Sequence, residues 1–522
     1  MKLERTRNAK RNVFSGLINR AINLLLPFTV RTAMIYTLGT QYLGLSSLFT
    51  SILSVLSLTE LGVGSAIVFH MYKPIAEDDE ETLCALLNYY KIIYRIIGFV
   101  VLTVGVLLIP FLPYLIKGTY PSDINLPILY LLYLSDSVSS YFLFAYYNSL
   151  LNAFQRNDIT SNIGSVITII RYLLQAFMLI MFRDYLLFIV VLPLTTIASN
   201  ILTAIAAKKY YPQYVCKGSI DDDLKKDIAV KVKGMIITKV QAVTRNSFDS
   251  IFISAFLGLG LTAIYSNYYY IMTSVIGIMF IVIPSITGGI GNSVASESID
   301  KNYSDMNKIN FIYMWMSGWC AICLACLYQP FMLLWMGKDM MFPDSVMFLF
   351  CLYFYALKIG DIRSVYFEVN GLWWENRYKA IAESAANIVL NYLLGKYLGV
   401  YGILLATILT ILIINFGYGS RIVFQHYFGL DKLSDYYLRN FHYLIITIVC
   451  GGITYLVCGL LPDNNIVAFI GKMCICLALP NMLYFVLYLK NNDFKIAIPW
   501  IFRTMGLNRF EIIRRMESFI GK

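Results

Sequence analysis

The residues best placed to do chemistry in this sequence are charged side chains inside long apolar stretches. Arg31, Lys239 and Arg245 lie in two such stretches, where the neighbouring side chains offer a cation little solvation. Ionisable groups at such positions are costly, and they usually face a cavity or one another. Arginine and lysine in a low-dielectric cleft bind dense anions well. We therefore predict that these three residues line a binding site for an anionic group.

A second basic pair, Lys91 and Arg95, lies four residues apart in another apolar stretch. On a helix these two side chains share a face, and like charges at this spacing repel each other. A purely structural pair would avoid that arrangement, so both residues are predicted to line the same cavity. The alternative is that both side chains extend toward the polar interface.

Three acidic residues in apolar stretches are candidates for coupling to an ion. Glu60 and Asp136 have no partner nearby in sequence, and Asp249 follows Arg245 by four residues. Glu60 and Asp136 could form a protonatable or sodium-coupled site, or pair with basic residues on other helices, which is the favoured interpretation. Asp249 could instead neutralise Arg245 on the same helix face.

Five further charges in apolar stretches have simpler interpretations. Lys358 and Asp361 are spaced as a local ion pair. Arg20, Glu383 and Lys472 lie near the ends of their stretches, where long side chains reach the interface. We expect no role in binding for these five residues.

These charges must be held by membrane-spanning helices. Hydrophobic residues make up 58% of the 522 positions and charged residues only 14%, whereas about a quarter of a soluble globular chain is charged. Apolar runs of about 20 residues span about 30 Å of hydrocarbon. An all-α integral membrane protein with fourteen transmembrane helices is predicted, at 13–37, 43–70, 84–113, 126–152, 159–182, 185–206, 234–257, 260–290, 309–336, 343–370, 378–396, 399–420, 441–460 and 466–489.

The basic residues outside these helices predict the orientation. Of 42 Lys and Arg residues, 27 fall in the two termini and the loops on their side, and 3 fall in the opposite loops. Basic residues accumulate on the cytoplasmic side, so both termini are predicted to be cytoplasmic. The net charge of +11 then reflects topology and attraction to anionic membrane lipids, and no nucleic acid partner is expected.

An internal repeat divides the chain. Leu43-Gly44-Leu45-Ser46 recurs as Leu259-Gly260-Leu261-Thr262, and Arg171-Tyr172-Leu173-Leu174 corresponds to Asn391-Tyr392-Leu393-Leu394. The order and similar offsets predict two six-helix lobes related by parallel duplication, a type of repeat that places substrate sites at the interface of the copies. The first helices of the two lobes, which carry Arg31 and Arg245, would then face each other. The predicted parts are an N-lobe (1–206), a cytoplasmic linker (207–233), a C-lobe (234–430), two C-terminal helices (431–490) and an amphipathic cytoplasmic tail (491–522).

The ten cysteines raise the question of a metal or disulfide. Cys320, Cys323 and Cys326 recur every three residues on one predicted helix, but no His or carboxylate nearby in sequence completes a site. Cysteines in apolar spans mostly behave as small hydrophobic residues. We predict no metal site, no cofactor and no catalytic residue.

The arrangement resembles the polysaccharide-transporter branch of the multidrug/oligosaccharidyl-lipid/polysaccharide exporter superfamily. The segments 42–53, 60–66 and 72–76 resemble the first hairpin of Wzx-like O-antigen and capsule flippases, and the likeness covers about residues 10–490. The resemblance implies alternating access by two lobes around a central cavity. It also implies a lipid-linked oligosaccharide on undecaprenyl pyrophosphate as cargo, a bacterial cytoplasmic membrane, and polysaccharide polymerases and glycosyltransferases as partners. A pyrophosphate is the kind of dense anion that the predicted basic residues would bind.

The alternative functions are a multidrug exporter, a lipid II flippase and a membrane polysaccharide polymerase. A multidrug exporter would favour acidic residues in its cavity, whereas the predicted helices hold more basic than acidic ones. The sequence alone distinguishes poorly between a flippase for lipid-linked oligosaccharides and a lipid II flippase. A membrane polysaccharide polymerase would be expected to have a large outer loop, and the longest predicted one, 114–125, offers only Lys117 and Asp123 as charged residues. No nucleotide-binding glycine loop with a lysine occurs, so an ion or glycan gradient is the expected energy source.

Overall fold

The computed structural model describes the backbone of residues 5–60 and 62–504; within these ranges, the side chains of 5–10, 13, 59, 60, 233–235, 237–239 and 501–504 lie outside the description. All regular structure in these ranges is helical, which confirms the predicted class. By its internal contacts the chain divides into two compact units, residues 1–266 and 267–522. The division falls inside one continuous helix, α10 (Leu259–Met279).

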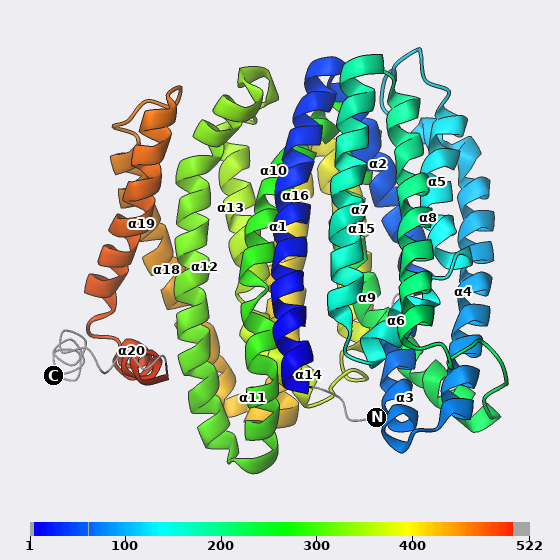
Figure 1. Ribbon diagram of the computed structural model, residues 1–522. Helices are drawn as coiled ribbons and strands as arrows, with labels where there is room; N and C mark the ends of the chain where they lie inside the picture. The colour runs from blue at the N-terminus through cyan, green and yellow to red at the C-terminus, as the bar shows by residue number, and fades with distance from the viewer. Residues whose placement is uncertain (1–4, 61, 505–522) are drawn as a thin grey trace. The chain divides into compact units, whose positions relative to one another are not determined.

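The first unit contains nine α-helices before α10, which Figure 1 labels, and three short helical turns or bulges. Helix α1 packs along α7, α2 along α9, and α8 against both α5 and α7. The elements are α1 (Arg5–Thr37), α2 (Thr40–Leu56), η1 (Ser57–Glu60), α3 (Val63–Glu77), α4 (Glu80–Leu108), η2 (Ile109–Leu115), α5 (Leu126–Phe142), α6 (Tyr146–Ala153), α7 (Asn157–Phe177), η3 (Met178–Phe182), α8 (Tyr185–Tyr210) and α9 (Asp222–Leu257).

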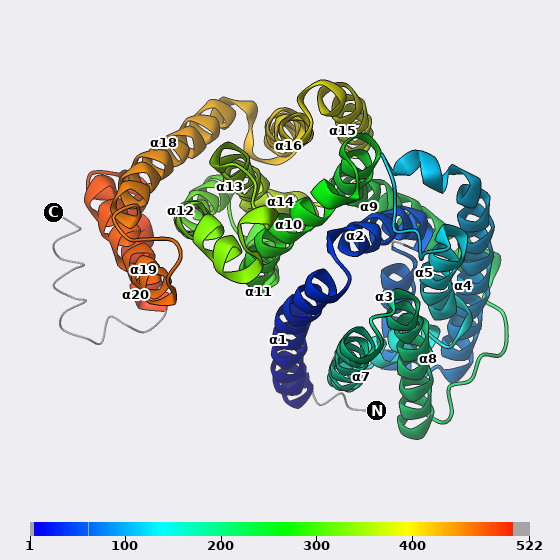
Figure 2. The same cartoon turned by 90° about the horizontal axis from the view of Figure 1, so that it is seen from above.

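The second unit is built around the long helix α12, against which α13, α18 and α19 pack (Figure 2). Helices α15 and α16 form a second close pair. The elements are α11 (Val282–Ser296), α12 (Ile299–Met336), η4 (Lys338–Met340), α13 (Asp344–Lys358), α14 (Asp361–Val369), α15 (Arg377–Leu398), α16 (Val400–Thr410), η5 (Ile411–Tyr418), α17 (Gly419–Val423), η6 (Phe424–Phe428), η7 (Leu430–Lys432), α18 (Leu433–Cys458), α19 (Ile466–Tyr488) and α20 (Asn492–Thr504). Helix α20 covers the start of the predicted amphipathic tail, and residues 505–522 lie outside the described chain.

Nine helical segments of the described chain are long and apolar enough to cross a membrane, and ten if the pair α5–α6, bent by 50°, counts as one span. The chain is thus a multi-pass membrane protein. The predicted spans that do not meet this measure are the first, second, seventh and eleventh, which correspond to α1, α2–α3, α9 and α15. Helices α1 and α9 carry Arg31, Lys239, Arg245 and Asp249. Half of the eight candidate site residues therefore lie on two helices that do not meet this measure.

Polar residues mark where several helices begin. Asp79 accepts a hydrogen bond from the Thr82 backbone N–H at 3.0 Å, and Asp184 accepts one from Leu187 at 3.0 Å. Asn125 does the same for Ile128 at 3.2 Å. The first N–H groups of a helix have no partner within it, and in or near lipid such groups must be satisfied by the protein. These caps fix the starts of α4, α8 and α5.

Two helical stretches of the second unit are wound as π-helix, at η5 (Ile411–Tyr418) and η6 (Phe424–Phe428), between and after the α-helical turns of α16 and α17. The π-helix is rare, because its wider turns leave the backbone less well packed, and it is frequent at functional sites. In η5, the backbone carbonyl of Asn415 accepts a hydrogen bond from the Arg363 side chain of α14, as described below.

Candidate functional site

One set of polar residues in the first unit lies around the N-terminal turns of α10. Arg31 on α1 donates a hydrogen bond from Nη1 to Ser266 Oγ at 3.1 Å. The preceding residue, Tyr265, donates from its hydroxyl to Asp249 Oδ2 on α9 at 3.0 Å. Two neighbouring residues of α10 thus hold a cation from α1 and an anion from α9, although these helices are distant in sequence. Asp249 is fully buried, and Arg245, one turn before it, is half-buried.

A second polar chain crosses three helices of the same unit. Arg171 on α7 donates from Nε to Thr195 Oγ1 at 2.8 Å and from Nη2 to Thr196 Oγ1 at 3.2 Å, both on α8. The Thr196 hydroxyl in turn donates to Asp136 Oδ1 on α5 at 2.6 Å. Asp136 is therefore linked through Thr196 to a basic residue of another helix.

Tyr172, the residue after Arg171 on α7, lies within electrostatic range of both Arg171 and Arg31, as expected from the close packing of α1 along α7. The two guanidinium groups thus belong to neighbouring helices. Like charges repel, and the cost is larger where water is scarce. This arrangement suits a site that receives an anion.

Lys91 and Arg95 lie elsewhere in the first unit, against the segment that follows α8. Asn88, one turn before Lys91, donates to the Gly218 carbonyl at 2.9 Å. Lys91 lies within electrostatic range of Cys216 in the same segment, and Arg95 within range of Tyr146. Burial raises the pKa of the Cys216 thiol, while a hydrogen bond from Tyr146 and the Lys91 charge act in the opposite direction. The neighbours of this pair thus differ from those of Arg31.

Two of the predicted site residues cannot be placed in the same way. The side chains of Glu60, at the end of η1, and Lys239, within α9, lie outside the described residues. Their assignment to the site stays a prediction.

The second unit holds a separate buried network. Arg363 is 3% exposed and donates from Nη2 to the backbone oxygen of Asn415 at 3.1 Å. The Asn415 amide donates to Glu383 Oε2 at 3.1 Å, and Lys379 Nζ lies 3.9 Å from the same oxygen. Glu383 is 1% exposed, so the expectation that it extends to the interface is wrong. Its partners on α15 and η5 satisfy it inside the protein.

Two further charges of the second unit have partners. Lys358 Nζ lies 2.7 Å from Asp361 Oδ2, which confirms the predicted local pair, and Tyr313 on α12 donates to the same oxygen at 2.6 Å. Lys472 is ion-paired with Asp463 in the loop before α19. Lys472 is 3% exposed, so its charge is satisfied by this carboxylate inside the protein, and the expectation that it extends to the interface is wrong.

The described residues also contain a group of thiols that the sequence did not bring together. The Sγ atoms of Cys326, Cys458 and Cys476 lie within 4.8 Å of one another and could hold a metal ion. In the sequence, the spacing on one helix placed Cys326 with Cys320 and Cys323. In the structure, the thiols close to Cys326 are those of Cys458 on α18 and Cys476 on α19. Similarly, Arg171, Tyr172 and Thr196 were not predicted as site residues, because hydrogen bonds between helices leave no local pattern.

Comparisons with known proteins identify the fold. No family model matches the chain, and no curated protein matches it in sequence. Among solved structures, the lipid II flippase MurJ in an inward closed conformation aligns over 91% of this chain and 98% of its own, at a TM-score of 0.63 and 15% identity. An inward-facing multidrug resistance MATE transporter of the MOP superfamily aligns over 78% of this chain and 98% of its own, at 0.58 and 14%. A MOP superfamily transporter from Pyrococcus furiosus, described as having a binding pocket of reversed polarity, aligns over 82% and 96%, at 0.51 and 14%. At these identities the likeness establishes a shared fold.

Proposed function

We propose that this protein is a flippase that carries an undecaprenyl-pyrophosphate-linked oligosaccharide from the cytoplasmic to the outer face of a bacterial cytoplasmic membrane by alternating access. The oligosaccharide would be a repeat unit of O-antigen, capsule or exopolysaccharide. Fourteen spans with both termini in the cytoplasm, as the distribution of basic residues predicts, belong to this proposal. The fold shared with a lipid flippase and with MATE transporters supports the general class.

The observation that carries the proposal is that Arg31 on α1 and Arg171 on α7 are both held by hydroxyl groups inside apolar helices that pack along each other. Arginine guanidinium groups form paired hydrogen bonds with phosphate oxygens, and moving bare phosphate through hydrocarbon is prohibitive without such partners. Both groups are also positioned by hydroxyl acceptors, Ser266 for Arg31 and Thr195 and Thr196 for Arg171. A pyrophosphate would find two cations already oriented.

The test is a flipping assay in proteoliposomes that contain a fluorescent undecaprenyl-pyrophosphate oligosaccharide. Losing one charge-assisted hydrogen bond costs about 1.5–3 kcal/mol, so Arg31→Ala and Arg171→Ala should each slow flipping by about ten- to a hundredfold. Arg183→Ala, at an exposed turn between η3 and α8, is the matched control and should flip at the wild-type rate. Wild-type rates in both test variants would refute the proposal.

A companion variant separates binding from structure. Thr196→Val keeps the Arg171 charge but removes its link to Asp136. If Arg171 acts on the cargo, this variant should retain much more activity than Arg171→Ala. Equal loss in both, with equal loss of thermal stability, would assign Arg171 a structural role instead.

Lipid II is a second candidate cargo, because the structure of the lipid II flippase covers nearly the whole chain. The same liposomes loaded with lipid II decide between the two cargoes by rate. Faster flipping of lipid II would replace the oligosaccharide in the proposal and leave the role of the two arginines in place.

Ion coupling is proposed for Asp249 in preference to Asp136. Asp249 is fully buried, where a carboxylate is costly to keep charged, while Asp136 is joined to Arg171 through Thr196. Asp249→Asn should abolish any dependence of flipping on a proton or sodium gradient. An unchanged gradient dependence would exclude Asp249 as the coupling residue.

A further inference from the structure

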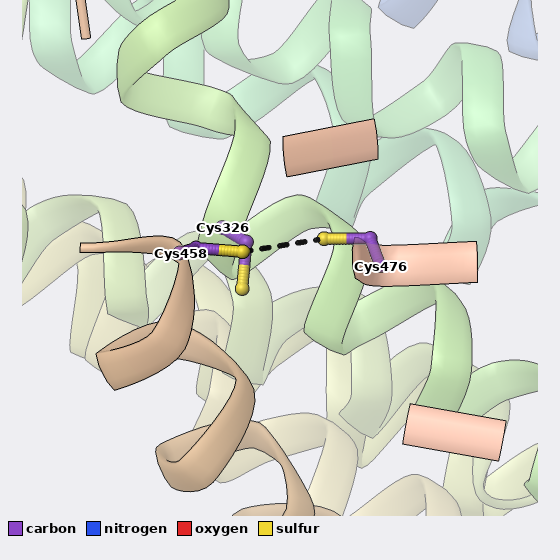
Figure 3. Close-up of side chains that lie close together, drawn as sticks. All are labelled: Cys326, Cys458 and Cys476. Carbon is purple, nitrogen blue, oxygen red and sulfur yellow. Dashed lines mark hydrogen bonds between the residues drawn. The ribbon is translucent and has the colours of Figure 1, made fainter. Parts of the chain in front are cut away.

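Three cysteines from three helices of the second unit place their thiols together (Figure 3). Cys326 lies on α12, Cys458 ends α18, and Cys476 lies within α19. Their side chains are 3%, 2% and 1% exposed. The sulfur atoms of Cys458 and Cys476 are 3.9 Å apart, and all three Sγ atoms lie within 4.8 Å of one another. Their positions span 150 residues of sequence, so helix packing brings them together.

The sulfur spacing fits a three-coordinate metal. A metal–sulfur bond of about 2.3 Å in a planar trigonal arrangement separates the sulfur atoms by about 4.0 Å. The observed separations of 3.9 to 4.8 Å need only a small contraction to reach this value. A disulfide, by contrast, requires two sulfur atoms at about 2.05 Å, and it would leave the third thiol without a role.

A small cavity with polar and charged side chains in its wall lies beside the cluster. Cys326 and Cys458 line a cavity of about 130 Å³, together with Gln329, Asp344, Asp463 and Lys472. One buried water needs about 10–15 Å³ of such volume, so the cavity has room for several water molecules beside the two thiols. The Lys472 side chain is buried in the same cavity wall, where it forms an ion pair with Asp463.

A fourth cysteine helps to hold the arrangement. Cys323, one turn before Cys326 on α12, donates its thiol hydrogen to the backbone oxygen of Cys476 at 3.9 Å. This contact fixes the backbone that carries one of the three thiols. Groups that orient the ligands of a metal commonly raise its affinity.

We propose that Cys326, Cys458 and Cys476 bind one thiophilic d10 metal ion, of the class of Zn(II) and Cu(I), through three thiolates. Three metal–sulfur bonds form, and the thiol protons leave to solvent through the cavity. The ion ties α18 and α19 to α12. The site is separate from the proposed cargo-binding arginines, which lie in the first unit.

The experiment uses the purified full-length chain in detergent, reduced with a phosphine, and cadmium(II) as the probe. Titration should produce a thiolate-to-cadmium absorption band that saturates at one ion per chain, with the stoichiometry confirmed by elemental analysis. Cys458→Ser and Cys476→Ser should each weaken binding at least tenfold. Cys450→Ser on α18 and Cys474→Ser on α19 are the matched controls, since neither residue belongs to the cluster, and both should bind as the wild type does.

A second measurement needs no variant and covers the case in which a serine variant fails to fold. In the wild type, cadmium should protect Cys326, Cys458 and Cys476 from alkylation in mass spectra, while the exposed Cys474 is alkylated at an unchanged rate. Equal cadmium affinity in wild type and folded Cys458→Ser protein would overturn the assignment. So would an absence of protection, or a Cys458–Cys476 disulfide formed by mild oxidation in a protein that binds no cadmium when reduced.

Discussion

Gly44 permits a close contact between two helices that a single methyl group would disrupt. A Cβ atom at this position would lie 2.2 Å from the backbone oxygen of Leu259 and 2.8 Å from its carbonyl carbon. Ordinary contact begins at 3.4 Å, so α2 and the start of α10 would have to separate by about 1.2 Å. The oxygen belongs to a helical backbone and cannot rotate away, unlike the end of a side chain.

The expected cost of Gly44→Ala follows from two opposing terms. Overpacking typically costs about 1–3 kcal/mol, and this contact belongs near the upper end because backbone must move. Alanine regains about 1 kcal/mol over glycine within a helix. We therefore expect a net loss of about 2 kcal/mol in the free energy of unfolding.

The predicted internal repeat supplies the control. Gly260 is the predicted counterpart of Gly44, and a Cβ atom there would meet nothing within 4 Å. Gly260→Ala should leave stability unchanged or raise it by up to about 1 kcal/mol. Thermal unfolding followed by tryptophan fluorescence in one detergent compares the two variants. Gly44→Ala melting at or above the wild-type temperature would refute the reasoning, as would an equal loss in both variants.

Two further predictions concern charged groups. The hydrogen bond from Thr82 holds the pKa of Asp79 below its ordinary value of 3.8, so the cap stabilises α4 above that pH and the benefit is lost as pH falls below it. The difference in melting temperature between wild type and Asp79→Ala should therefore shrink between pH 5 and pH 3, whereas Asp79→Asn, which caps without titrating, should show no such trend. Glu383→Gln should destabilise the protein by several kcal/mol, up to about 3–5, because it leaves the buried Lys379 charge without its carboxylate. Asp222, which forms an exposed ion pair with Lys225, is the control. Chemical denaturation that finds Glu383→Gln as mild as Asp222→Asn would contradict the buried-pair argument.

Much of the fold was predictable from the sequence because long apolar runs indicate membrane-spanning helices. The described chain is helical throughout its regular structure, and α4, α12 and α19 lie where long apolar runs predicted spans. The 50° bend between α5 and α6 was not predicted. It occurs around Phe144, whose φ of 61° is unusual for a residue other than glycine.

The site was predictable only in part. Arg31 was recognisable because a cation in an apolar run is conspicuous by itself. Its partner Ser266 lies 235 residues away, and a serine in a membrane helix is unremarkable in sequence. Thr196, between Arg171 and Asp136, was invisible for the same reason. Glu383 was misinterpreted because nearness to a predicted span end suggested exposure, while the fold surrounds it with α15 and η5 partners.

The π-helical stretch η5 has a consequence for how this span can change in length. In a continuous α-helix, adding or removing one residue turns every later side chain by about 100° around the axis. A π-helical turn already accommodates a surplus residue, so a single deletion within 411–418 could be absorbed by rewinding to α-helix. Such a deletion would draw the Asn415 carbonyl back into the helical ladder and away from Arg363. Natural length variation in this span should therefore concentrate in η5 and accompany replacement of the buried arginine.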